Sequence, residues 1–239
     1  MRSFALVLAL VSAVGCRRAP PEPTAVTVPP APKGPCSEAD LEVVRIEDCE
    51  ARCTSGVANA CATAAKKYWG GVGVKQSTKR VVELGERGCE LGSGHACGLV
   101  ASAAMGLHDG IDGVFKDAAR VKAFGAKAFP LLVAACELGD SHACDNAGFW
   151  LEKGLSVEKD PVRAATFTKR AQALWKAGCD AGQGFLCGRL ALSRFTAGQE
   201  ADAAPLYARA CELGHAPSCE SAAEGVDDAR RLGFLDGTE

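Results

Sequence analysis

The chain has 239 residues, and its 27 Lys and Arg against 29 Asp and Glu give a formal net charge of −2. A charge this close to zero offers no electrostatic support for nucleic-acid binding, so we expect no nucleic acid among its partners. Aromatic residues make up 6% of the chain, which is also rich in alanine. This composition favours packed helices over sheets.

The first 15 residues have the pattern of an export signal. Arg2 supplies a positive charge, and the apolar run over residues 4–14 is shorter than the about 20 residues that span a bilayer. Residues 13–16 read Ala-Val-Gly-Cys and resemble a bacterial lipobox, in which cleavage precedes the cysteine and its thiol is acylated. We therefore expect residues 1–15 to be a lipoprotein signal peptide and Cys16 to carry the lipid that anchors the chain in a membrane. Ordinary secretion with a chance cysteine is the alternative.

Residues 16–35 are rich in proline, which prevents a packed core and favours an extended spacer. We expect this segment to be a tether between the lipid anchor and a folded part over residues 36–239. Arg17 follows the cysteine in place of an acidic residue, which favours the outer over the inner membrane of a bacterial envelope.

The cysteines are numerous and regularly spaced. Ten of the 13 form five pairs, and seven residues separate the two cysteines of every pair, which marks a repeat. A glycine three residues after each first cysteine predicts a helix end, so the second cysteine falls in the first turn of the next helix. Antiparallel helices joined by so short a turn bring such thiols within disulfide reach. The predicted disulfides are Cys53–Cys61, Cys89–Cys97, Cys136–Cys144, Cys179–Cys187 and Cys211–Cys219.

Cys36 and Cys49 remain as a sixth pair by elimination, once Cys16 is assigned to lipid. In one continuous helix over residues 36–53 these thiols would stand roughly 20 Å apart. Either residues 37–45 are not continuously helical, or one thiol stays free. Metal binding is the rival interpretation of the cysteines, but zinc sites usually contain short C-x-x-C spacings, and an exported chain meets an oxidising compartment. We expect no metal and no cofactor.

A second signature precedes three of the cysteine pairs. It reads G-V-G-V-K-Q-S at 71–77, G-V-F-K-D at 113–117 and G-L-S-V-E-K-D at 154–160, and the last residue of each copy predicts a helix N-cap. With the paired cysteines, these residues resemble the Sel-1-like repeat, a relative of the tetratricopeptide repeat, over essentially all of residues 46–225. The resemblance implies an all-α solenoid of about five helix-turn-helix repeats, each stapled by its own disulfide. It also implies a monomeric scaffold that binds a protein or peptide partner in the envelope.

The repeats differ in length. The distance from N-cap to first cysteine is 12 residues in the second repeat and 19 in the third and fourth, which predicts longer first helices there. Pro130 predicts a kink or restart within the third repeat. Residues 226–235 are expected to form a terminal capping helix.

The first helices of the long repeats are basic. In the family that the chain resembles, first helices build the concave face of the solenoid. A groove lined by these cations would suit an acidic peptide or an anionic envelope polymer, and solvated helix faces are the alternative interpretation. The candidate binding residues are Arg120, Lys122, Lys127, Arg163, Lys169, Arg170 and Lys176.

The search for catalytic motifs is mostly negative, so we expect partner binding and not catalysis. His95, His142 and His215 fall in predicted interhelical turns, where solvated side chains are the ordinary interpretation. Some cysteine-rich Sel-1-like proteins are described as penicillin-binding or β-lactamase-like, and Ser156 to Lys159 spell S-x-x-K. No S-D-N or K-T-G motif accompanies it, and it falls on the repeat's own linker. We assign no catalytic residue, and weak β-lactamase-like activity is the alternative function.

Overall fold

The structure is a computed structural model that describes residue 36 and residues 44–106 and 116–223. These residues form ten α-helices and no strand, and none of these helices is long and apolar enough to span a bilayer. The expected signal peptide, tether and capping helix lie outside the described residues. The helices are α1 (Ile46–Thr54), α2 (Ala58–Gly70), α3 (Thr78–Glu90), α4 (Gly94–Ala104), α5 (Ala118–Glu137), α6 (Ser141–Lys153), α7 (Pro161–Asp180), α8 (Gly184–Thr196), α9 (Glu200–Glu212) and α10 (Ala216–Ala223).

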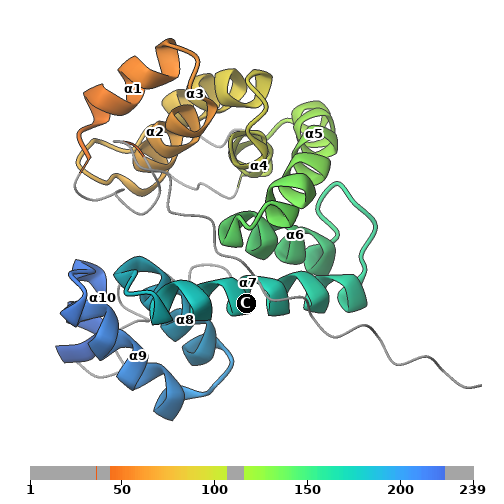
Figure 1. Ribbon diagram of the computed structural model, residues 1–239. Coiled ribbons are helices and arrows are strands. Elements are labelled where there is room, and N and C mark those ends of the chain that lie inside the picture. Colours follow the sequence, from red (N-terminus) through yellow and green to blue (C-terminus); the bar gives the residue numbers. More distant parts are fainter. Residues whose placement is uncertain (1–35, 37–43, 107–115, 224–239) are drawn as a thin grey trace, which may run out of the picture.

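The helices pack in chain order as five helix-turn-helix pairs, from α1/α2 to α9/α10, and the pairs follow one another along an arc (Figure 1). The all-α solenoid of about five repeats is therefore confirmed. Each pair is closed by the predicted turn, in which a glycine with φ between +84° and +94° follows the first helix. The backbone N–H of the next residue donates a hydrogen bond to a carbonyl of that helix, as the N–H of Asp140 does to the Ala135 carbonyl at 3.0 Å. Such hydrogen bonds satisfy carbonyls at the end of the helix that have no partner within the helix.

Each of these turns carries a disulfide. The five predicted pairs are bonded, with Cα–Cα distances of 4.5 to 4.6 Å. A sixth bond joins Cys36 to Cys49, whose Cα atoms are 5.2 Å apart. The objection that one helix would hold these two apart does not apply, because α1 begins only at Ile46. The buried hydroxyl of Thr63 donates to the Cys36 carbonyl at 3.1 Å, which fixes this residue against α2.

The linkers between repeats end in the predicted N-caps. The side chains of Ser77, Asp117 and Asp160 accept hydrogen bonds from backbone N–H groups at the starts of α3, α5 and α7. Helices α5 and α7 have 20 residues against 13 in α3, as the longer spacing predicted. Of the kink or restart expected at Pro130, the restart is wrong, because α5 is one helix that contains this proline. Proline removes only one backbone N–H from the helix, and the other hydrogen bonds of the long helix hold Pro130 in the helical conformation.

The largest core cluster lies where α4 to α8 meet. Its large side chains include Leu132, Trp150 and Leu174, each at most 3% exposed. Burying a side chain of this size stabilises the fold by about 1.5–3 kcal/mol. The two cysteines of the turn between α5 and α6, Cys136 and Cys144, are fully buried in the same cluster, so that disulfide and core form one unit.

Candidate functional site

A cluster of polar side chains joins the second helices of four successive repeats. We call it the inner cluster, because it lies on the inner side of the arc, as shown below. Hydrogen bonds, an ion pair and ring contacts link these residues across repeat boundaries. Its members are Lys66 of α2, His95 of α4, Asp140 at the N-cap of α6, His142, Asp145 and Asn146 of α6, and Arg189 of α8.

Lys66 and His142 meet across two repeats. The Nζ atom of Lys66 lies 3.2 Å from Nε2 of His142. Burial and the nearby charge of Arg189 lower the pKa of Lys66 to about 7, against the weaker opposing effect of two carboxylates. Burial, followed by the charge of Lys66, holds the pKa of His142 well below its ordinary value. His142 is therefore neutral at pH 7, and its imidazole can accept a hydrogen bond from the amine.

His95 is held by two partners on the neighbouring repeat. Its Nε2 lies 3.1 Å from a carboxylate oxygen of Asp140, and its Nδ1 lies 3.1 Å from the amide nitrogen of Asn146. Because the amide nitrogen only donates, Nδ1 accepts and Nε2–H donates to Asp140. Burial raises the pKa of Asp140, but the bonds from His95 and from the backbone N–H groups of Ala143 and His142 outweigh it, so the pKa lies below its ordinary value.

Arg189 links the fourth repeat to the third. It donates to a carboxylate oxygen of Asp145 at 2.7 Å, and its guanidinium carbon lies 5.2 Å from the ring centre of Trp175. Burial raises the pKa of Asp145, and Arg189 opposes that effect. The buried Nε atom of Arg189 has no hydrogen-bond partner among the described residues. This nitrogen is a donor that the fold itself leaves open.

The contact between Lys66 and His142 shows which helices lie inside the arc. Since α2 and α6 belong to repeats two apart, their side chains can touch only if the second helices lie at the smaller radius. In Figure 1, α2, α4 and α6 lie on the inner side of α1, α3 and α5. This differs from the expectation that first helices build the concave face. Of the second helices, α2 and α4 also pack directly against each other.

The interpretation of the histidines as solvated turn residues is wrong for His95 and His142. They are the second residues of α4 and α6, their ring centres are 4.9 Å apart, and the side chain of His95 is only 18% exposed. His215 lies in the turn before α10 but hydrogen-bonds to Ser218 at 2.7 Å. The available sequence signal was the position of His95 and His142, each two residues before a second cysteine. Spacing alone did not show that these positions meet.

The basic residues singled out from the sequence lie on α5 and α7. Two contacts join α7 to α5: the guanidinium of Arg163 lies 6.0 Å from the ring centre of Phe129, and Arg170 donates to the Glu137 carbonyl at 3.1 Å. Six of these residues form pairs seven positions apart, which places both members of a pair on one helix face. Lys169 and Lys176 lie about 120° around α7 from Arg163 and Arg170, and Lys122 lies about 160° around α5 from Arg120. We use the name basic face for the whole set of six residues and Lys122. The pairs are Arg120 and Lys127, Arg163 and Arg170, and Lys169 and Lys176.

Local carboxylates engage part of the basic face. Arg120 pairs with Glu86 at 3.2 Å, and Lys176 pairs with Asp180 at 2.7 Å. Exposed ion pairs of this kind contribute about 0–1 kcal/mol, so exchanging one for an incoming carboxylate costs little. Three side chains of the basic face make neither a hydrogen bond nor an ion pair to another described residue: Lys122, Lys127 and Lys169.

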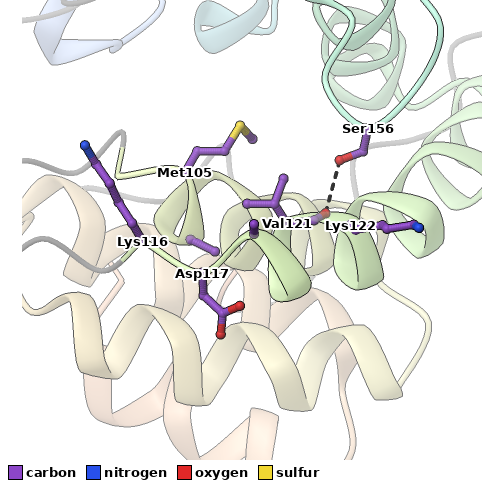
Figure 2. A pocket seen from close by; sticks show the side chains of 8 residues that line it. Met105, Lys116, Asp117, Val121, Lys122 and Ser156 are labelled. Atoms are coloured by element: carbon purple, nitrogen blue, oxygen red, sulfur yellow. Dashed lines mark hydrogen bonds between the residues drawn. The ribbon is translucent and has the colours of Figure 1, made fainter.

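Ser156, the first residue of the S-x-x-K sequence, lies in the linker before α7. It borders an open pocket of about 420 Å³, and its hydroxyl donates to the Val121 carbonyl at 3.1 Å (Figure 2). The ammonium groups of Lys116 and Lys122 point away from this hydroxyl in Figure 2. A nucleophilic serine needs a base that accepts its proton, whereas here a backbone carbonyl accepts the hydrogen bond. The contact fastens the linker to α5.

Comparisons with known proteins find similar solved structures. The Sel1 repeat protein from Oxalobacter formigenes is 19% identical with a TM-score of 0.39, and the match covers 81% of this chain and 71% of that one. A protective antigen of uropathogenic Escherichia coli, c5321, which displays an SLR fold, is 17% identical with a TM-score of 0.37. That match covers 76% of this chain and 44% of the antigen. No family model and no curated protein matches the chain.

Proposed function

We propose that this protein is a lipid-anchored scaffold of the bacterial envelope that binds a protein or peptide partner. Its disulfide-bonded turns indicate an oxidising, exported environment. The lipobox at Cys16 and the proline-rich tether support anchoring, with the outer membrane favoured. A Cys16→Ser variant that still fractionates with membranes would contradict the anchor.

The observation that carries the proposal is the arrangement of the basic face. The contacts of Arg163 and Arg170 with α5 place these two cations of the fourth repeat against the basic first helix of the third repeat. Lys169 is exposed on α7, and Lys122 is exposed at the start of α5. Repeat proteins use such extended surfaces, which several repeats share, to bind partners. An acidic peptide or an anionic polymer matches this surface in charge.

Charge reversal tests this proposal. We expect an Arg163→Glu/Lys169→Glu variant of the full lipoprotein to lose at least tenfold in capture of its envelope partner, because two attractive charges become repulsive. An Arg45→Glu/Lys79→Glu variant changes the net charge equally at side chains that are 74% and 79% exposed on the first repeats, and should capture as the wild type does. Equal capture by all three proteins would refute binding at the basic face.

Lactam hydrolysis is the competing function, and it depends on Ser156. The hydrogen bond from Ser156 to a backbone carbonyl favours a structural role for this side chain. We therefore expect nitrocefin turnover by the purified protein to equal that of its Ser156→Ala variant. Turnover that disappears with this substitution would favour the hydrolase.

A further inference from the structure

We propose that the inner cluster binds a carboxylate group of an acidic peptide, with Lys66 and Arg189 as its ligands. The inference rests on the proposed function and adds to it a defined recognition point. Lys66 extends from α2, and Arg189 from α8, toward the same helix α6, where they meet His142 and Asp145. Lys66, when it is protonated, and Arg189 therefore bring two positive charges to one helix.

The two carboxylates of the cluster are already engaged. One oxygen of Asp140 accepts from the backbone N–H groups of His142 and Ala143, and the other accepts from His95. Asp145 accepts from Arg189 at 2.7 Å. The charge of Arg189 nevertheless acts on Lys66 more strongly than either acid does. A carboxylate that binds between Lys66 and Arg189 would interact favourably with both cations and would favour the protonated form of Lys66.

An incoming group can reach this cluster. The side chains of His95, Arg189 and Asp145 are 18%, 25% and 32% exposed, although they are crowded by several helices. Partial exposure in a crowded setting is what the floor of a concave surface produces. The guanidinium of Arg189 has the planar fork that suits a carboxylate.

Carboxylate binding should be coupled to protonation of Lys66. Its neighbours across the inner surface are His95 on α4, Asp140, His142 and Asp145 on α6, and Arg189 on α8. On the other side of α2, Glu50 of α1 and Arg80 of α3 pair with each other. A bound carboxylate favours the charged ammonium, so it raises the pKa of Lys66 above 7, and binding takes up a proton. Affinity should then fall by about tenfold for each pH unit above 7.

Calorimetry with pentaglutamate as the probe tests this coupling on the full lipoprotein in detergent. We expect binding at pH 7, an affinity about 50-fold lower at pH 9, and at pH 8 an enthalpy that changes with the ionisation heat of the buffer. Lys66→Met should weaken binding at pH 7 at least tenfold and remove the pH dependence. Lys66→Arg should keep binding at pH 9, because arginine stays charged. Lys79→Met, an equal charge change on exposed α3, should behave as the wild type.

Several outcomes would overturn the inference. They are the absence of pentaglutamate binding, an affinity that does not depend on pH, and equal losses in Lys66→Met and Lys79→Met. The fold of Lys66→Met is checked by its thermal melt, which should not fall, since the substitution removes a crowded amine. Charge reversal of the basic face and partner capture form a separate experiment. Failure here, with capture intact, would leave the scaffold function standing.

Discussion

At the scale of single residues, Asp140 combines two functions at the start of α6. One carboxylate oxygen caps the helix by accepting from two backbone N–H groups, and the other accepts from His95 of the preceding repeat. Asp160 is a cap whose partners lie on its own helix: one oxygen accepts from the N–H of Arg163 at 2.9 Å, and the other lies 4.0 Å from Nε of the same residue. The two side chains are similarly exposed, 39% and 35%, so Asp160 is a matched control.

Replacing Asp140 should cost more stability than replacing Asp160. Loss of a cap lowers the free energy of unfolding by about 0.5–2 kcal/mol, and loss of a hydrogen bond to a charged group lowers it by about 1.5 kcal/mol more. In urea unfolding at pH 7, Asp140→Ala should therefore lose about 1.5 kcal/mol more of this free energy than Asp160→Ala. The folded pKa of Asp140 is depressed, so its stabilisation is present above the unfolded pKa and lost as pH falls through the folded value. The difference in free energy of unfolding between the two variants should therefore become smaller below pH 4. Equal costs at pH 7 would refute the role of His95.

At the scale of elements, the linker before α7 rests directly on α5. Ser156 has φ +56°, which non-glycine residues rarely adopt, and its hydroxyl bonds to Val121. A Cβ at Gly125 would lie 2.2 Å from Oγ and 2.3 Å from Cβ of Ser156. Glycine is thus required on α5 wherever the serine occupies this turn. At Gly98 of α4 a Cβ would meet only Trp150, at an ordinary 3.6 Å.

Gly125→Ala should destabilise the protein, and Gly98→Ala should not. We expect the first to cost about 1–3 kcal/mol from overpacking, and the second to be neutral or to gain up to about 1 kcal/mol of helix propensity. Ser156→Gly removes both clashing atoms, so it should restore much of the loss in the double variant. Chemical denaturation of the wild type, the three single variants and the Gly125→Ala/Ser156→Gly double variant measures these differences in free energy of unfolding. No rescue in the double variant would show that the linker does not press on α5.

At the scale of the whole molecule, short disulfide loops stabilise every repeat. Each closes seven intervening residues and contributes about 2–3 kcal/mol by restricting the unfolded chain. Together the repeat disulfides are comparable to the whole stability of an ordinary domain, about 5–15 kcal/mol. The inner cluster and the core add contacts between repeats, whereas each of these disulfides acts within one turn.

Reduction should therefore loosen the whole solenoid. We expect a reducing agent to lower the melting temperature of the helices by more than 15 °C and to broaden the transition. Repeats that lose their disulfides should unfold less cooperatively. Circular dichroism at 222 nm with and without the agent measures this change. An unchanged melting curve would mean that packing alone holds the repeats together.

The sequence determined the features that depend on nearby residues. The turn glycines, the N-caps at Ser77, Asp117 and Asp160, and the disulfides of the turns were all predicted, because one short segment fixes each of them. The same spacing predicted the longer α5 and α7. The continuity of α5 through Pro130 was not predicted, since a local helix preference omits the support of neighbouring helices.

Only the tertiary structure decided which surface is the inner one. The arrangement of Lys66, His142 and Arg189 around α6 depends on the curvature of the arc. No spacing in the sequence encodes that curvature directly, because it sums small rotations over several repeats. The residues of each turn thus determine how a repeat is built, and contacts between repeats determine which side chains share a site.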